Sequence, residues 1–102
     1  MSIVKVMFKI YNPVDVSKYV EVDGIVDTGA TYSVASSPLL DSIVEGNIGG
    51  VIIEVMGRKG AVTVIFGEEG DVNVLGVTAL EALGLEVNVV KGTLKEAEQL
   101  LL

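Results

Sequence analysis

Two residue types on which many catalytic sites depend are missing from this chain, which contains no cysteine and no histidine. The absence of cysteine excludes disulfide bonds, thiolate nucleophiles and cysteine-ligated zinc sites. The absence of histidine excludes triads and dyads that use an imidazole base. Carboxylates, hydroxyls and lysines remain as the available chemistry, and we expect neither a metal site nor a cofactor.

Basic residues and long uncharged runs are also scarce. Lys and Arg together number 7 against 14 Asp and Glu, which gives a net charge of -7. Such a chain lacks the basic patch that follows a phosphate backbone, so we expect no nucleic-acid partner. The longest run without a charge, 28–40, contains Ser, Thr and Pro, and the start MSIVKVMF does not resemble a signal peptide. We therefore expect a soluble cytoplasmic protein with no membrane partner.

The apolar residues that are present favour strands over helices. The chain is 50% hydrophobic but only 5% aromatic, and it contains 19 Val and 8 Ile. β-branched residues of this kind pack well on a pleated sheet. With 102 residues the chain is long enough for one domain, which we place at 1–102.

Two hairpins are predicted from alternating apolar runs separated by turn residues. The first joins strands in 2–11 and 18–26, and the second joins 51–56 to 61–66 through a turn at 57–60. Shorter strands are expected in 32–36, 72–75 and 85–90. With about seven short strands, the chain is predicted to be mainly β, as a compact barrel or sandwich.

One short helix is predicted with a start and a stop signal. Thr78 with Glu81 matches a capping box, and Gly84 is suited to end the helix. The segment 38–44 reads as a turn or a short helical segment. Two alternatives remain open for the tail: a turn at Lys91–Gly92 into a short strand, or a helix that Thr93 caps.

The sequence Val26-Asp27-Thr28-Gly29-Ala30-Thr31 stands out because it follows an apolar strand directly. Small residues after Asp27 allow other backbone to approach closely, and Thr28 places a hydroxyl beside the carboxylate. By itself Asp-Thr-Gly is also a common turn composition. Further along the chain, Val74-Leu75-Gly76 leads straight into the predicted helix.

These two motifs, in this order, resemble the retropepsin-like aspartic proteases, with IVDTGAT at 25–31 and NVLG at 73–76 before the helix. The hairpin between them is also similar to the family's, so the resemblance covers roughly residues 18–90. It implies a closed β-barrel of the retropepsin-like acid protease type with one short α-helix. It also implies an aspartic endopeptidase that needs no metal or cofactor.

The resemblance assigns roles to individual residues. Asp27 corresponds to the catalytic aspartate, Thr28 to the hydroxyl that ties two catalytic loops together, and Gly29 to the glycine beside the carboxylate. The expected substrate-binding residues are Ala30, Thr31, Asn47, Ile48, Gly49 and Gly50. Expected to pack in support of the active site are Val74, Leu75 and Gly76.

Amide hydrolysis by carboxylates needs two of them sharing one proton, one acting on a water and the other on the carbonyl oxygen. The chain has a single Asp-Thr-Gly, at Asp27. The second carboxylate must then come from a second copy, so the resemblance implies a twofold homodimer acting on a peptide or protein substrate.

The sequence leaves two other interpretations open. The stretch between Thr31 and Val51 is shorter than the family's flap hairpin requires, and 46–50 is either a shortened flap tip or only a loop. A short flap favours an alternative function, a proteolytically weak or inactive dimerisation or peptide-binding module of the same fold. A third interpretation is an unrelated small barrel in which Asp27 lies in a turn.

Overall fold

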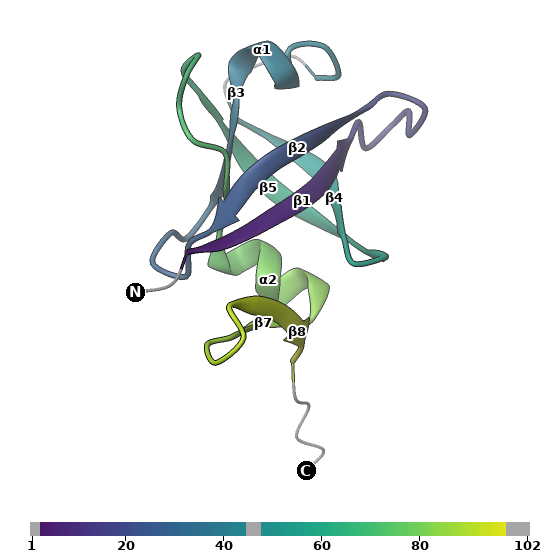
Figure 1. Ribbon diagram of the computed structural model, residues 1–102. Coiled ribbons are helices and arrows are strands. Elements are labelled where there is room, and N and C mark those ends of the chain that lie inside the picture. Colours follow the sequence, from purple (N-terminus) through teal and green to yellow (C-terminus); the bar gives the residue numbers. More distant parts are fainter. Residues whose placement is uncertain (1–2, 45–47, 98–102) are drawn as a thin grey trace.

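The computed structural model describes residues 3–44 and 48–97 of the chain, and six of its strands close into a barrel (Figure 1). The order around the barrel is β1-β2-β6-β3-β5-β4, and β4 pairs back with β1. These strands are β1 (Val4–Tyr11), β2 (Tyr19–Val26), β3 (Ser33–Ser36), β4 (Ile48–Val55), β5 (Arg58–Gly67) and β6 (Val74–Leu75). The predicted mainly-β closed barrel is confirmed.

Both predicted hairpins are present. β1 and β2 pair antiparallel along their whole length, from Val4 opposite Val26 to Tyr11 opposite Tyr19. β4 and β5 pair up to Val55 opposite Arg58, and only Met56 and Gly57 connect them. Both turn residues have positive φ, 54° and 76°, as in the tight turns that match the twist of a hairpin. The turn is therefore earlier and tighter than the predicted 57–60.

Two short helices cover opposite ends of the barrel, α1 (Ser37–Leu40) and α2 (Val77–Leu83) (Figure 1). Gly84 ends α2 with a φ of 68°, as predicted. The prediction that Thr78 caps the helix is wrong, because Gly76 is the N-cap and Thr78 lies inside the first turn. The Thr78 hydroxyl donates instead to the carbonyl oxygen of Thr31.

The tail forms a separate two-stranded hairpin of β7 (Leu85–Asn88) and β8 (Thr93–Glu96). The turn and short strand are confirmed, and a helix beginning at Thr93 is wrong. β7 is shorter than the predicted 85–90, because the Asn88 side chain accepts hydrogen bonds from the amides of Val90 and Lys91 and so starts the turn.

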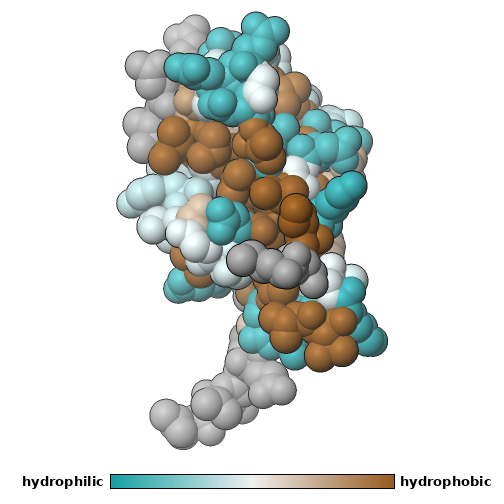
Figure 2. Space-filling view, turned by 60° about the vertical axis from the view of Figure 1, so that its left-hand side comes forward, coloured by the Kyte–Doolittle hydropathy of each residue, from teal (hydrophilic) through white to brown (hydrophobic). Residues whose placement is uncertain are grey.

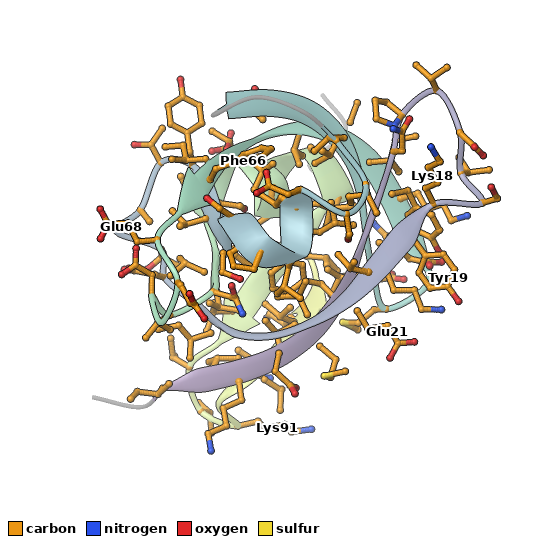
Figure 3. All side chains as sticks on the ribbon, turned by 90° about the horizontal axis from the view of Figure 1, so that it is seen from above. Lys18, Tyr19, Glu21, Phe66, Glu68 and Lys91 are labelled. Carbon is orange, nitrogen blue, oxygen red and sulfur yellow. The ribbon has the colours of Figure 1, made fainter. Side chains whose placement is uncertain are left out.

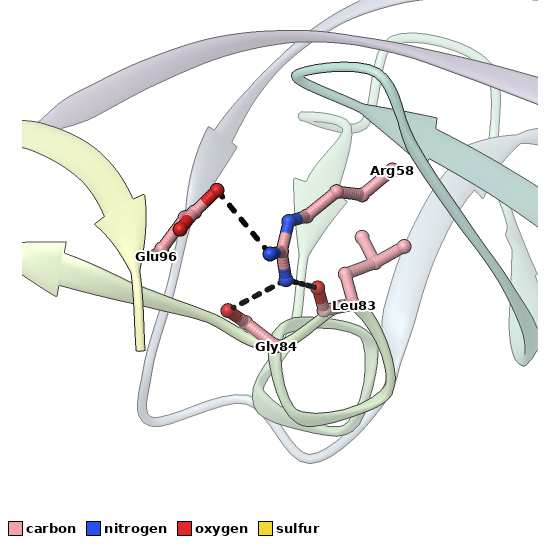
Figure 4. A network of polar contacts seen from close by, with 4 residues as sticks. All are labelled: Arg58, Leu83, Gly84 and Glu96. Atoms are coloured by element: carbon pink, nitrogen blue, oxygen red, sulfur yellow. Dashed lines mark hydrogen bonds and ion pairs between the residues drawn. The ribbon is translucent and has the colours of Figure 1, made fainter. Parts of the chain in front are cut away.

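Arg58 fastens this hairpin to the barrel (Figure 4). Its guanidinium donates to the carbonyl oxygens of Leu83 and Gly84, at 2.8 and 3.3 Å, and pairs with Glu96 at 3.3 Å. A cation at the end of α2 also matches the partial negative charge of a helix C-terminus. The first residue of β5 therefore joins α2 to β8.

The hydrophobic core fills the barrel and continues to both helices. Side chains from the barrel strands are almost fully buried, and Leu40 of α1 and Leu80 of α2 close the two ends. Viewed from above, the labelled charged side chains of Lys18, Glu21, Glu68 and Lys91 lie around the outside (Figure 3). Among the described residues, no helix has the length and apolar character needed to cross a membrane.

Candidate active site

Asp27 lies where the chain leaves β2, and its backbone is fixed by the neighbouring strand. β2 and β6 pair in parallel, with Val26 opposite Leu75. The amide of Asp27 continues this ladder by donating to the carbonyl oxygen of Leu75 at 3.1 Å. Asp27, Thr28 and Gly29 are all exposed in the single chain. The loop is therefore firmly anchored at its start while its side chains point away from the core.

The loop itself orients the carboxylate. The amide of Gly29 donates to Oδ1 of Asp27 at 2.9 Å, and the amide of Ala30 donates to the Asp27 carbonyl oxygen at 3.1 Å. A Cβ at Gly29 would lie 3.2 Å from the same Oδ1, so a larger residue would crowd the carboxylate. Within the described residues Oδ2 accepts no hydrogen bond, which leaves it available to a water or a second carboxyl group.

The start of α2 holds the far end of the loop. The amide of Val77 donates to the carbonyl oxygen of Ala30 at 2.8 Å. Both the amide and the hydroxyl of Thr78 donate to the carbonyl oxygen of Thr31, at 3.1 and 2.7 Å. The two motifs that were expected to lie together, 27–31 and 74–76, are thus directly hydrogen-bonded.

Gly76 lies so close to the loop that no other residue fits there. A Cβ at this position would lie 2.6 Å from the backbone of Tyr32 and 2.9 Å from the Ala30 carbonyl oxygen. The amide of Gly76 donates to the hydroxyl of Ser33 at 2.9 Å, and Ser33 is fully buried. A buried amide needs such a partner, so Ser33 supports the crossing point of the two motifs.

Ser33 and Asn73 are supporting residues that the sequence interpretation missed. Asn73, just before β6, joins β2 to β3: its side chain donates to the Asp23 carbonyl oxygen and accepts from the Ser36 amide, and its own carbonyl oxygen accepts from the Ile25 amide. The available signal, for Ser33 alone, was a polar residue in a predicted strand, which needs a hydrogen-bond partner where it is buried.

An apolar row runs across the outer face of the sheet beside Asp27. Ile25 pairs with Val74, Val74 with Val34, and Val34 with Ile65, so the four side chains follow one another across β2, β6, β3 and β5. All four are partly or well exposed, while Leu75 and Ala35, their neighbours in the chain, are fully buried. Figure 2 shows the brown band that apolar side chains make down one face of the molecule. Of the row, only Val74 was expected at the site.

A cavity of about 420 Å³ opens directly beside the carboxylate. Asp27 and Thr28 form its polar wall, and the remaining wall is apolar, from Val4, Val26, Val87 and Val89. Asp27 is the only acid among the described residues that line it. The described part of the chain also holds no group of three or more acidic side chains placed to bind a metal ion.

The expected flap residues that the structure describes do not line the cavity beside Asp27. Asn47 lies outside the described residues. Ile48, Gly49 and Gly50 belong to β4, where they pair with Ile65, Val64 and Thr63 in the barrel wall. Gly50 lines a separate cavity of about 370 Å³ together with Tyr32 and Thr78.

Taken together, the site presents one oriented and exposed carboxylate beside an apolar cavity and an apolar row of side chains. No protein-family model matches the chain, and a comparison with curated proteins finds no match either. A single ionised carboxylate can accept a proton or hold a water. It cannot also supply the acid that amide hydrolysis needs.

Proposed function

We propose that this chain is a homodimeric aspartic endopeptidase that hydrolyses peptide bonds with the Asp27 side chains of two copies and an activated water. The observation that carries the proposal is the Asp27 loop. It is held between β6 and α2 by backbone hydrogen bonds, yet it leaves its carboxylate exposed and oriented by the Gly29 amide. This arrangement is half of a two-carboxylate site and supports a twofold partner.

The surroundings of Asp27 support a peptide as the substrate. The row of Ile25, Val74 and Val34 offers apolar contacts to side chains of an extended segment lying across the face of the sheet. Sites for peptides commonly combine backbone hydrogen bonds to an extended segment with pockets for alternate side chains. The row is therefore expected to favour apolar side chains next to the cleaved bond.

In the proposed reaction the two carboxyl groups share one proton. The ionised carboxylate takes a proton from the water as it attacks the carbonyl carbon, while the protonated one donates to the carbonyl oxygen. The tetrahedral intermediate then collapses and the C–N bond breaks: the carboxyl group that took the proton of the water gives it to the leaving nitrogen, and the other carboxylate takes a proton from a hydroxyl of the intermediate, which restores the dyad. Because the dyad carries a single proton, it titrates as a unit, and activity requires that proton to be present.

The direct test compares the wild type with Asp27→Asn on a denatured protein substrate between pH 3 and 7, with products identified by mass spectrometry. We expect Asp27→Asn to lower the cleavage rate by at least about 10²-fold, since it removes a group acting in acid–base catalysis. Asp41→Asn is the matched control, because Asp41 is an exposed acid at the end of α1. The control should retain wild-type cleavage.

A dimer must be present for the same experiment to be informative, so sedimentation velocity accompanies the assay. Cleavage that survives in Asp27→Asn would remove Asp27 from the mechanism. A stable monomer at every concentration would contradict both the endopeptidase and any function that depends on pairing of the Asp27 loops.

A second candidate, a dimeric peptide-binding module without appreciable proteolysis, is favoured by the position of Gly49 and Gly50. Both are paired into the barrel wall, and the turn of their own hairpin, Met56–Gly57, lines a different cavity from Asp27. A site without a covering hairpin excludes water less well. A folded dimer that binds apolar peptides but cleaves none of them at any pH would identify this function instead.

A further inference from the structure

A second cavity, of about 400 Å³, lies on the outer face of the sheet and shares no lining residue with the cavity beside Asp27. It forms where β2, β1 and the β4–β5 hairpin lie side by side. Glu21 of its wall and Asp27 lie roughly 20 Å apart along the direction of β2. Neither the proposed dyad nor the loop that supports it uses a residue of this cavity.

A row of alternating charge crosses four strands at this point. Glu21 of β2 is opposite Lys9 of β1, which in turn is opposite Glu54 of β4. Lys59 of β5 follows, opposite Glu54. Opposite charges at such positions attract each other across neighbouring strands. Among the described residues, however, no ion pair joins either glutamate to a lysine.

Two tyrosine rings hold the lysines away from these carboxylates. The Lys9 ammonium lies 5.5 Å from the centre of the Tyr19 ring, and the Lys59 ammonium lies 4.8 Å from that of Tyr11. The electron-rich face of an aromatic ring attracts a cation. Glu21 therefore keeps an exposed carboxylate that has no ion-pair partner within the described part of the chain.

Two methionines supply the apolar part of the cavity. Met7 is 54% exposed and Met56 is 59% exposed, and both line the cavity together with Glu21 and Glu54. Methionine is flexible and polarisable, so it adapts to apolar groups of different shape. An occupant that suits both parts carries a positive group on an aliphatic stem, which describes the side chains of arginine and lysine.

The charge of the wall fits a single positive group. It contains the carboxylates of Glu21 and Glu54 and the ammonium of Lys9, so negative groups exceed positive ones by one. No group of three or more acidic side chains in the described part of the chain is placed to bind a metal ion. The net charge of -7 also attracts cationic partners to the molecule.

The cavity is open, which suits a side chain presented by a polypeptide. Among the residues of its wall only Phe8 is buried, and four are exposed, Met7, Glu21, Met56 and Gly57. Sites for free small molecules usually enclose roughly 70–90% of the ligand surface. A side chain needs less enclosure, because the chain that carries it makes further contacts outside the cavity.

We infer that the cavity between β2, β1 and the turn after β4 binds an arginine or lysine side chain of a polypeptide partner. The carboxylates of Glu21 and Glu54 hold the positive group, and Met7 and Met56 cover the aliphatic stem. The inference goes beyond the proposed endopeptidase, since neither Asp27 nor a second copy of the chain takes part in this site.

The test titrates the peptide acetyl-Gly-Arg-Gly-amide into the full chain and follows the methyl signals of Met7 and Met56 by NMR. We expect both signals to shift and to saturate. The same peptide with citrulline in place of arginine should cause no saturable shift, because citrulline has nearly the same shape without the charge. Asp27→Asn should bind the arginine peptide as the wild type does.

Two substitutions in the wall should change the dissociation constant in opposite directions. Glu21→Gln removes a carboxylate and should raise the constant about 5-fold, whereas Lys9→Met removes the competing ammonium and should lower it about 3-fold. Glu68→Gln is the matched control, because Glu68 is an exposed acid on the other side of the barrel from Glu21 (Figure 3). It should leave the constant within about 2-fold of the wild type.

The contrary outcomes each overturn the inference at a different step. Equal binding of the arginine and citrulline peptides would contradict recognition of a positive group. Equal effects of Glu21→Gln and Glu68→Gln would mean that the acidic surface attracts the peptide without a defined site. Methionine signals that do not respond at all would remove the site. Absence of cleavage by the wild type, by contrast, would contradict the endopeptidase and leave this site standing.

Discussion

The barrel and the terminal hairpin differ in how much each depends on its surroundings. The barrel closes on itself, and its inward side chains, such as Ile10, Ile53 and Leu75, are fully buried. In the hairpin only Leu85 is buried, and among the strands that the structure describes β7 and β8 pair only with each other. An isolated two-stranded hairpin is marginally stable in water. The barrel can therefore hold Asp27 alone, whereas the hairpin needs a support.

The two regions meet at the candidate active site, which gives the difference a consequence for function. The cavity beside Asp27 takes Val26 from the barrel and Val87 from the hairpin. The backbone of the loop that carries the carboxylate is hydrogen-bonded to β6 and α2, and the carboxylate accepts from the Gly29 amide of the same loop. Disruption of the barrel should therefore abolish the site, and disruption of the hairpin should remove only one part of the cavity wall.

Gly76→Ala is expected to have the largest effect, because it adds a methyl group at the point where the end of β6 contacts the Asp27 loop. A Cβ at Gly76 would lie 2.6 Å from the Tyr32 backbone, which cannot move without breaking the hydrogen bonds of the loop. Overpacking of this kind costs about 3 kcal/mol of unfolding free energy. Urea unfolding followed by circular dichroism, at one protein concentration, measures the loss.

Gly50→Ala is the control for that comparison, because a Cβ at Gly50 would have no neighbour within 4 Å. Its unfolding free energy should stay within about 0.5 kcal/mol of the wild type. Equal losses in the two variants would mean that the close approach at Gly76 does not constrain the loop.

Much of this fold was predictable from local patterns. The alternating apolar runs identified the two long hairpins of the barrel, and Gly84 marked the end of α2. The close placement of 27–31 and 74–76 was also expected, and the backbone bonds between them bear this out. The hairpins and the helix end depend on side-chain period and turn chemistry, which a single sequence carries, whereas the placement of the two motifs was implied by the family resemblance.

Features that depend on long-range pairing were not predictable in the same way. Thr78 matched a capping residue, but the Thr31 carbonyl oxygen takes its hydroxyl, a contact across 47 positions of sequence. Gly49 and Gly50 had the composition of a free loop, yet β5 pairs with them in the barrel wall. Composition cannot show which strand edge a glycine-rich segment will join. It also does not indicate that the buried Ser33 hydroxyl accepts a hydrogen bond from the Gly76 amide.

Arg58→Met should have an intermediate effect, confined to the hairpin. The variant loses the hydrogen bonds to the Leu83 and Gly84 carbonyl oxygens and the ion pair with Glu96. We expect a cost of about 1 kcal/mol, since the ion pair is mostly exposed and the carbonyl bonds carry most of the contribution. Hydrogen exchange measures it, as an increase of roughly 5-fold in amide exchange over residues 85–97 with little change in β1 to β6.

Glu96→Gln separates the two parts of the Arg58 contact, because it removes the ion pair and keeps the carbonyl bonds. It should reproduce only a small fraction of the change. Lys18→Met, which removes an exposed cation from the β1–β2 connection, should leave exchange in the hairpin unaltered. Exchange that rises equally in the barrel and the hairpin of Arg58→Met would mean that the two regions unfold together.

Tyr11→Phe should have the smallest effect, at a short strand pairing that closes the barrel. β1 and β4 pair over only three positions, Lys9 to Tyr11 opposite Glu54 to Ile52. The Tyr11 hydroxyl donates to the Glu54 carboxylate at 2.6 Å, and this hydrogen bond raises the pKa of Tyr11 from 10.0 to about 12.

Because the pKa of Tyr11 is higher in the folded state, the hydrogen bond stabilises the folded state below pH 10. This stabilisation is lost as the pH rises towards 12. The difference in stability between wild type and Tyr11→Phe should therefore shrink from pH 9 to 12, as measured by urea unfolding at each pH. A difference that is constant over this range would show that the hydroxyl does not close the barrel through Glu54.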